Sequence, residues 1–301
     1  MKATPYLLVL TGLLMAIRSS AQQDPIYAQY LTNPLTINPA YAGINNQFTA
    51  RLQYRTQWAG MDANPRTFNF SSNTSIVQNK MGIGVMILQD KLGDIRNLEL
   101  TVPVSYKLKF ENSILSFGMQ AGLINQKNNP SELSIHDPDD PAFAPYSSMA
   151  FNLGSGVMLK GEKFRVGLSV PRMLPATINT QGQKIELYKQ VYYLMGAYNF
   201  MLKDKLWFKP SVLLRGTKGS PLSADINATF TFRDFYSAGL VTRNFQTFGA
   251  LVQVLFKNYH LIYVFELPQS KNAGLRFTSH EIGIGISRGL FTYHDNVPKV
   301  F

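Results

Sequence analysis

Hydrophobic and polar residues alternate with a period of two along most of the chain. In residues 48–58, FTARLQYRTQW, the even-numbered positions are mostly apolar, and the opposite face carries Arg51, Gln53, Arg55 and Gln57. This alternation is the pattern of a β-strand that has one apolar face. We find no segment with the 3.6-residue period that a helix would need.

Fourteen segments show this alternation, and most are close to the length of about nine to eleven residues that a tilted transmembrane strand requires. The predicted strands are residues 48–58, 66–76, 81–89, 98–110, 113–123, 149–159, 164–170, 191–201, 206–215, 223–232, 235–241, 247–256, 259–265 and 280–290.

The links between these strands fall into two classes. Those after even-numbered strands are short, such as NK at residues 79–80 and KN at 257–258, whereas those after odd-numbered strands are mostly longer and reach residues 125–148 and 171–190. Bacterial outer-membrane barrels have tight periplasmic turns, long outer loops and an even number of strands. The link lengths therefore favour such a barrel over a secreted, soluble β-sandwich, which is the alternative.

The charged residues indicate which face points inward. An Arg or Lys on the lipid side of a barrel costs about 2–4 kcal/mol near the midplane. We therefore expect the apolar faces to contact lipid and the polar faces to line the lumen. The predicted fold is an all-β transmembrane antiparallel β-barrel of about 14 strands over residues 48–301, and the predicted lumen-facing residues are Arg51, Gln53, Arg55, Gln57 and Glu281.

The first 21 residues are typical of a secretory signal peptide. Lys2 precedes an apolar run over residues 6–17, and the small residues Ser19, Ser20 and Ala21 form a cleavage site. Twelve apolar residues are too few to span a bilayer as a helix. We expect an exported mature chain that begins near Gln22 and ends up in the outer membrane.

The composition and charge of the chain argue against one class of function, nucleic-acid binding. The chain contains no cysteine, and 45% of its residues are hydrophobic while 16% are charged. The net charge is +11, or +9 without Lys2 and Arg18, because 27 basic residues then face 18 acidic ones. These basic residues are spread along the whole chain, which disfavours nucleic-acid binding.

Residues 22–47 do not alternate. Two Asn-Pro pairs, at Asn33-Pro34 and Asn38-Pro39, exclude both a helix and a central strand. We expect a compact, irregular segment that serves as a plug or as a docking surface for a partner, or else a simple lead-in that caps the barrel floor. The candidate plug or docking residues are Asn33, Pro34, Asn38, Pro39, Tyr41 and Gly43.

Three stretches resemble signature segments of the PorP/SprF family of the type IX secretion system and its associated gliding machinery. They are QDPIYAQYLTNPLTINPAYAG at residues 23–43, YRTQWAGMDANPRTFNFS at 54–71, and SHEIGIGI at 279–286. The tail FTYHDNVPKVF departs from the family, whose members tend to end in an aromatic residue soon after the closing strand. The resemblance covers essentially the whole mature chain.

This resemblance implies an outer-membrane protein that exports or anchors a surface adhesin or another cargo protein with a type B C-terminal domain. It also implies contact with the periplasmic ring of the secretion machinery. Two alternatives stay open, namely a plugged outer-membrane channel for small solutes and a purely structural anchor for the secretion or gliding apparatus.

No enzyme or cofactor site emerges from the sequence. The acidic stretch HDPDDP at residues 136–141 could bind calcium through Asp137, Asp139 and Asp140, but it lacks the spacing of a calcium loop, and a solvated outer loop is the better interpretation. The four histidines show no zinc spacing. Glycines that recur every second residue predict bends in the wall or contact with the plug; they are Gly82, Gly84, Gly154, Gly156, Gly283 and Gly285.

Overall fold

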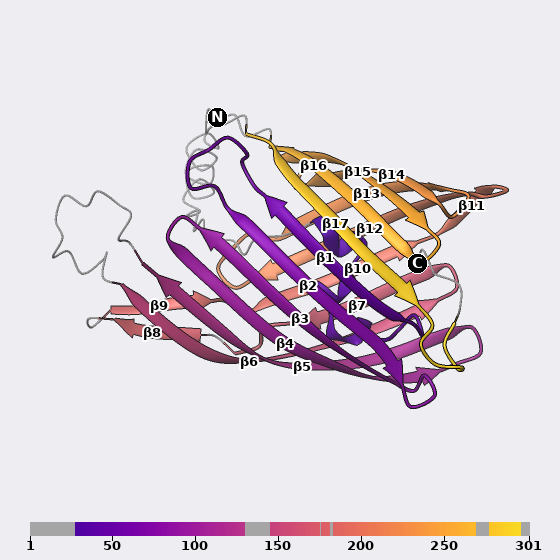
Figure 1. Cartoon of the computed structure of the whole chain (residues 1–301), viewed down its shortest axis with the longest axis horizontal. Coiled ribbons are helices and arrows are strands. Elements are labelled where there is room, and N and C mark those ends of the chain that lie inside the picture. The colour runs from indigo at the N-terminus through magenta and orange to yellow at the C-terminus, as the bar shows by residue number, and fades with distance from the viewer. Residues whose placement is uncertain (1–27, 130–144, 175, 181–182, 269–276, 296–301) are drawn as a thin grey trace, which may run out of the picture.

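The computed structural model describes residues 28–129, 145–174, 176–180, 183–268 and 277–295, and it is a β-barrel (Figure 1). The first seven strands are β1 (Phe48–Thr56), β2 (Arg66–Ile76), β3 (Met81–Leu92), β4 (Ile95–Lys109), β5 (Ser113–Asn128), β6 (Tyr146–Gly161) and β7 (Phe164–Val170). The later barrel strands are β10 (Val191–Tyr198), β11 (Phe200–Lys203), β12 (Leu206–Thr217), β13 (Ser223–Phe232), β14 (Tyr236–Arg243), β15 (Thr247–Phe256), β16 (Tyr259–Pro268) and β17 (Ser279–Arg288).

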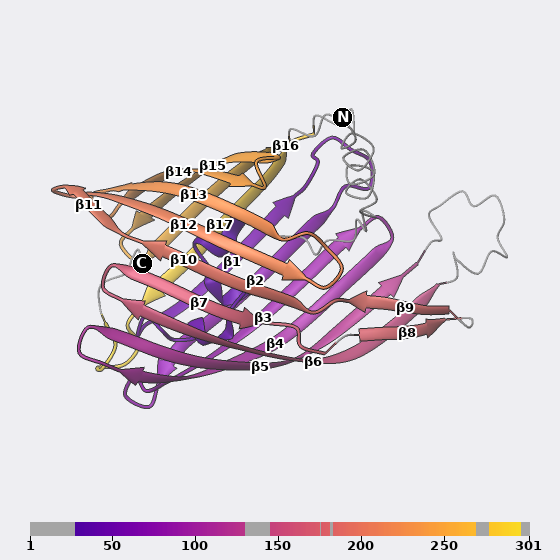
Figure 2. The same cartoon turned by 180° about the vertical axis from the view of Figure 1, so that it is seen from behind.

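The strands follow one another around the barrel as antiparallel neighbours. β1 pairs with β17 on one side and with β2 on the other. The ring closes where β10 pairs with both β7 and β12, which Figure 2 shows from behind. Since β11 continues β10 after a break at Asn199, the ring has fourteen strand positions. The prediction of a closed, antiparallel barrel of about 14 strands is confirmed.

The observed links differ from the predicted ones in two places. β3 and β4 extend toward each other, so that Gly93 and Asp94 form a tight turn in which Gly93 adopts a φ of +58°. The link predicted over residues 171–190 contains a separate hairpin of β8 (Ala176–Thr180) and β9 (Gln183–Tyr188), which projects from the barrel (Figure 1).

The two ends of the barrel carry different links. We call the end with the links β2–β3, β4–β5 and β6–β7 the turn end, and the end with the β8–β9 hairpin the loop end. β1 begins at the turn end with Phe48 and finishes at the loop end with Thr56.

Large apolar side chains are exposed on the outward faces of the strands. On β4 the residues Leu98, Leu100, Val102 and Val104 are 37–49% exposed, while Thr101 and Ser105 on the opposite face are buried. This is the register in which lipid covers the apolar face and the lumen receives the polar one. Within the described residues, no helix is long and apolar enough to cross a membrane.

The lumen is not polar all the way round, which corrects the expectation of a uniformly polar interior. On the β10–β16 side, buried apolar residues face inward, including Val191, Leu213, Ile262 and Val264. β16 alternates between exposed and buried residues, yet Leu261 and Ile262 are both apolar. Strict alternation cannot reveal such a wall because both of its faces are hydrophobic.

Candidate functional site

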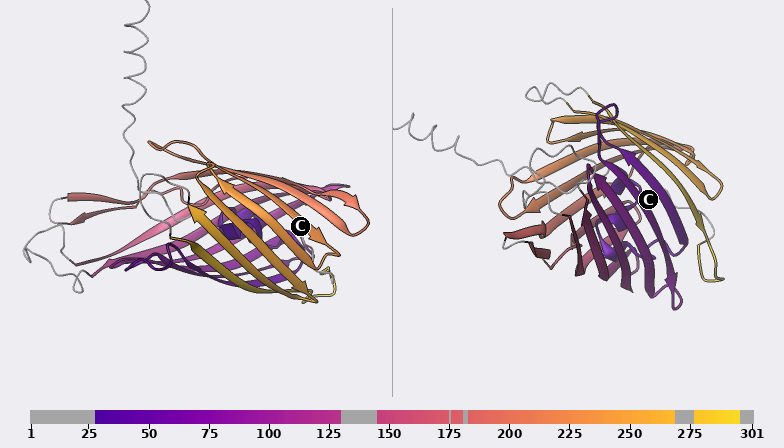
Figure 3. Two further views of the ribbon diagram at one scale, coloured as in Figure 1. Left: turned by 90° about the horizontal axis from the view of Figure 1, so that it is seen from above. Right: turned by 60° about the vertical axis from the view of Figure 1, so that its left-hand side comes forward.

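Residues 28–47, which we call the N-terminal segment, form three short 3₁₀-helices inside the ring of strands (Figure 3). These are η1 (Ala28–Leu31), η2 (Pro34–Thr36) and η3 (Pro39–Tyr41). The expectation that the Asn-Pro pairs exclude any helix is wrong for these single turns. Each pair places a proline at the start of a helix, where its missing N–H and fixed φ are tolerated. The Asn38 side chain caps η3 by accepting a hydrogen bond from the Ala40 N–H at 2.9 Å.

The candidate residues of this segment are buried. Asn33 and Asn38 are each 1% exposed, Tyr41 is 7% exposed, and Pro34 and Pro39 are buried as well. Gly43 adopts a φ of +61°, and its N–H donates to the Asn73 Oδ1 at 3.0 Å.

Side chains from β1 to β7 hold the N-terminal segment by hydrogen bonds. Asn33 Nδ2 donates to Ser71 Oγ on β2 at 2.8 Å, and Asn38 Nδ2 donates to the carbonyl of Val157 on β6 at 3.1 Å. Further donors satisfy the carbonyls of the segment; they are Ser105 to Ala42 at 2.8 Å, Ser116 to Ala40 at 2.7 Å and Ser169 to Ile37 at 2.6 Å. An irregular segment must find partners for its buried backbone groups, and the barrel wall supplies them.

Glycines in the wall let the segment approach closely. A Cβ at Gly82 would lie 2.0 Å from the Ala42 carbonyl oxygen, and one at Gly118 would lie 2.1 Å from the Ala40 nitrogen. A Cβ at Gly156 would lie 2.2 Å from the Asn38 Oδ1. The segment therefore occupies the volume that side chains at these positions would fill.

The opposite side of the N-terminal segment meets the apolar part of the wall. Residues of the segment and of β6, β10, β12, β14, β15 and β16 form one buried hydrophobic cluster. From the segment it contains Ala28, Tyr30, Leu31, Leu35, Ile37, Ala40, Tyr41, Ala42 and Ile44, and from the wall Met158, Val191, Tyr193, Met195, Leu213, Val241, Leu251, Ile262 and Val264.

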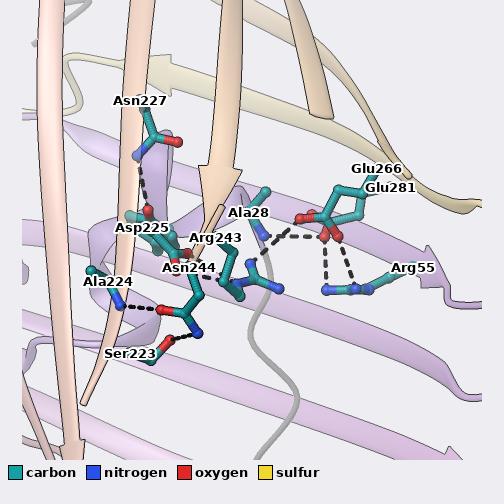
Figure 4. Close-up of polar contacts among 11 residues, drawn as sticks. Ala28, Arg55, Ser223, Ala224, Asp225, Asn227, Arg243, Asn244, Glu266 and Glu281 are labelled. Carbon is teal, nitrogen blue, oxygen red and sulfur yellow. Dashed lines mark hydrogen bonds and ion pairs between the residues drawn. The ribbon is translucent and has the colours of Figure 1, made fainter. Parts of the chain in front are cut away.

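A buried network of charges lies near the loop end of the lumen (Figure 4). Arg55 contacts Glu266 at 2.9 Å and Glu281 at 3.1 Å through its two terminal nitrogens. Arg243 contacts Asp225 at 3.2 Å and Glu266 at 3.4 Å. Two arginines thus hold three carboxylates from three strands, which offsets the cost of burying charge.

The N-terminal segment joins this network directly. The Ala28 N–H donates to Glu281 Oε1 at 3.1 Å (Figure 4). Asn227 Nδ2 donates to the Tyr30 hydroxyl at 3.0 Å. Burial, together with the nearby Asp225 carboxylate, raises the pKa of Tyr30, so this phenol stays neutral.

The predicted lumen residues lie at different depths. Arg51, Gln53 and Arg55 point from β1 away from the lipid-facing side, and all three are buried, as is Glu281 on β17. Gln57 is half-buried and lies in the link after β1, which ends at Thr56 rather than at the predicted residue 58. The structure brings Arg55 and Glu281 together, whereas Arg51 lies closer to the turn end.

Among the described residues, no group of three or more His, Asp and Glu side chains could hold a metal ion. The acidic stretch at residues 136–141 lies outside the described residues.

Comparison with known families decides the identity. Residues 19–286 match the family described as type IX secretion system membrane protein PorP/SprF. The chain belongs to the PorP/SprF family. As a β-barrel of this family it is an outer-membrane protein. The short turns of such barrels lie in the periplasm, so we expect the turn end to face it.

Several solved structures are similar to this PorP/SprF protein, and the first of those named here supports its barrel fold. The TodX monoaromatic hydrocarbon channel deltaS2 mutant has a TM-score of 0.51 and 10% identity, with 86% of this chain and 94% of the other covered. The CymD monoaromatic hydrocarbon channel has a TM-score of 0.49 and 11% identity over 89% and 94% of the two chains. The NanC porin has a TM-score of 0.43 and 10% identity over 80% and 98%. No curated protein matches the chain.

Sequence reasoning missed several residues of this site. Glu266 falls one residue beyond the predicted strand 259–265. Asp225 lies on the polar face of the predicted strand 223–232, but no local pattern indicates its neighbours. Gly118 contacts the N-terminal segment as closely as Gly82 does, but it stands outside the GIG and GSG patterns. Only the position of Gly118 on the polar face of its strand could have indicated its role.

Proposed function

We propose that this protein exports or anchors one surface adhesin, or another cargo protein with a type B C-terminal domain, as part of the type IX secretion system. Membership of the PorP/SprF family over residues 19–286 is the observation that carries the proposal. The role requires docking and passage of a partner and no catalytic step.

We assign the N-terminal segment to sealing the lumen and to presenting a docking face toward the periplasm. Its burial supports this assignment, since Leu35 and Ile44 are each 1% exposed. So does its attachment to the wall, because directional hydrogen bonds from several strands hold it in one position.

Deletion of the gene, followed by comparison of the secreted and surface proteomes, tests the role. We expect the selective loss of one adhesin or cargo protein from the surface, restored by the wild-type gene. Pull-down from solubilised outer membranes should recover that cargo together with components of the periplasmic ring. An unchanged surface proteome with lost motility would instead support a structural anchor.

Reconstitution in liposomes tests the solute-channel alternative. We expect the purified wild-type protein to pass little solute, and a variant that lacks residues 28–46 to pass small solutes freely. Appreciable flux through the wild-type protein would favour a channel over an export component.

A further inference from the structure

A cavity of about 660 Å³ lies at the turn end of the barrel, below the N-terminal segment. Ile44 and Asn46 from the segment form one wall, and Ile114, Lys160, Trp207 and Lys209 from three strands line the rest. Its volume is typical of ligand pockets, which are about 300–1,000 Å³. Such a cavity accepts a short peptide segment but no folded domain.

The deep part of this cavity is cationic. Lys160 and Lys209 line it, Lys160 Nζ donates a hydrogen bond to Asn45 Oδ1, and Arg165 and Arg51 lie near enough to Lys209 for their charges to act on it. The Arg165 guanidinium lies over the Tyr41 ring at 5.5 Å from its centroid, which connects this cluster to the N-terminal segment. Arg51 is 9% exposed, and its Nη1 makes no hydrogen bond within the described part of the chain.

The buried carboxylates that the structure describes are confined to one part of the lumen, and the buried cations occur in both parts. Arg51, Lys107, Lys160 and Arg165 are buried in the turn-end halves of their strands, while Arg55 and Arg215 are buried in the loop-end halves. The buried carboxylates among the described residues all lie in loop-end halves; they are Asp90, Glu99, Asp225, Glu266 and Glu281. The rim of the cavity carries both signs, because the exposed Glu111, Glu162 and Asp234 line it together with lysines, whereas the charges deeper in the barrel at this end are cationic. A cationic region attracts the opposite sign, so a carboxylate that passes the rim meets cations.

The remaining surface of the cavity selects for apolar groups. Ile44, Ile114 and Trp207 supply an apolar surface next to the two lysines. The rim at the turns has both signs, with exposed Lys163 beside exposed Glu162, and solvent and salt screen these charges. The half-buried Asp295 also lines the cavity, and its charge acts on Lys107. The deep lysines and the apolar wall of the cavity thus determine which ligands it selects.

We propose that this turn-end cavity binds a short peptide segment that carries carboxylates next to apolar or aromatic side chains, presented by a periplasmic partner protein. The carboxylates pair with Lys160 and Lys209, and the apolar side chains pack on Ile44 and Trp207. A lipid headgroup is a poorer occupant, because the cavity lies within the ring of strands and lipid covers the outward faces. The inference rests on the proposed function, which places a partner at the periplasmic face.

Binding of labelled peptides to the purified full-length protein in detergent tests the proposal. The probes are fluorescein-labelled pentapeptides DFEFD, its amide twin NFQFN and the basic KFKFK, followed by fluorescence anisotropy. We expect DFEFD to bind at least about tenfold more tightly than NFQFN, more weakly as salt is raised, and KFKFK to bind least. The double variant Lys160→Gln with Lys209→Gln should lose at least about tenfold in DFEFD affinity.

Two controls isolate the cavity. Lys218→Gln removes an exposed charge at the loop end and should leave the affinity for DFEFD unchanged. Migration of unheated samples in denaturing gels shows whether each variant is a folded barrel. If the double variant fails to fold, the single variants Lys160→Gln and Lys209→Gln replace it. We expect each of them to lose part of the affinity for DFEFD. Failure of DFEFD to bind, equal binding of DFEFD and NFQFN, or wild-type affinity in the folded lysine variants would overturn the proposal.

The peptide-binding test and the gene-deletion test of the proposed function can fail independently. If gene deletion removes one adhesin from the surface but DFEFD does not bind, the cavity proposal falls and the secretion role stands. If deletion leaves the surface proteome intact, the secretion role falls whatever the peptides do.

Discussion

The two halves of the barrel wall contact the N-terminal segment in different ways. Strands β1 to β7 offer hydroxyls, amides and glycines, and they hydrogen-bond to the backbone and the asparagines of the segment. Strands β10 to β16 offer apolar side chains such as Val191, Leu213 and Ile262, which join the hydrophobic cluster of the segment.

The two kinds of contact therefore have different effects on the N-terminal segment. Hydrogen bonds are directional and leave a large penalty when a buried partner is lost, so the polar half determines where the segment lies. Apolar burial is non-directional and roughly proportional to area, so the other half determines how strongly the segment is held. Changes in the two halves should therefore have different consequences.

Loss of the arginine that links β1 to β16 and β17 should have the largest effect. Arg55→Met leaves Glu266 and Glu281 buried with one cation fewer, which costs about 3–5 kcal/mol of unfolding free energy. Urea unfolding in lipid vesicles measures this cost. The exposed Arg66→Met is the control, with a change within about 0.5 kcal/mol. Equal stability of the two variants would contradict a role for the charge network.

Truncation in the apolar half should lower the global stability without releasing the segment. Ile262 is 1% exposed, so Ile262→Ala should cost about 2–5 kcal/mol. Its neighbour Leu261 is 52% exposed on the lipid side, and Leu261→Ala should cost clearly less. Thermal unfolding compares the two variants. A larger loss for Leu261→Ala would place the apolar core outside the lumen.

Filling the space between wall and segment should displace the segment. Gly118→Ala places a methyl group 2.1 Å from the Ala40 nitrogen, and such overpacking costs about 1–3 kcal/mol. We expect residues near 28–46 to lose protection from hydrogen exchange while the strands keep theirs. Gly196→Ala is the matched control, since its Cβ would meet only Val212 at 3.7 Å. Unchanged protection in Gly118→Ala would rule out the close approach.

Removal of one polar anchor should have the smallest effect on stability and a local effect on position. Asn38→Ala loses the cap of η3 and the bond to Val157, which together contribute about 1–2 kcal/mol. The same hydrogen-exchange experiment should show faster exchange around η3. Asn112→Ala, in an exposed turn, serves as control. If Asn38→Ala unfolds the whole barrel, the assignment of position to the polar half is wrong.

Much of the barrel could be predicted from the sequence because alternation reports directly on a wall with lipid on one side and polar groups on the other. Residues 98–110 alternate strictly, and β4 was predicted almost to its last residue. The β10–β16 half is less regular because its inward residues pack on the N-terminal segment and are apolar as well. β13 is the exception, because its inward Ser223, Asp225 and Asn227 are polar and alternate with the outward face.

The site could be predicted only in outline. Asn33 and Asn38 were singled out because each precedes a proline, yet their partners Ser71 and Val157 lie tens of residues away. Which strands meet across a closed lumen depends on barrel size and strand tilt, which no local pattern encodes. The charge network of Arg55, Glu266 and Arg243 and the turn-end cavity depend on that geometry in the same way.

Cross-linking through introduced cysteines tests most directly whether the N-terminal segment lies inside the barrel on its polar half. The chain has no cysteine, and the side chains of Asn33 and Ser71 lie 2.8 Å apart at their hydrogen-bonded atoms. In oxidised outer membranes, Asn33→Cys with Ser71→Cys should form a disulfide in most molecules, as mass spectrometry of the digested protein would detect. Asn33→Cys with Leu52→Cys, whose second position faces lipid, should form none. Absence of the first cross-link, with both cysteines open to a water-soluble maleimide, would contradict the account.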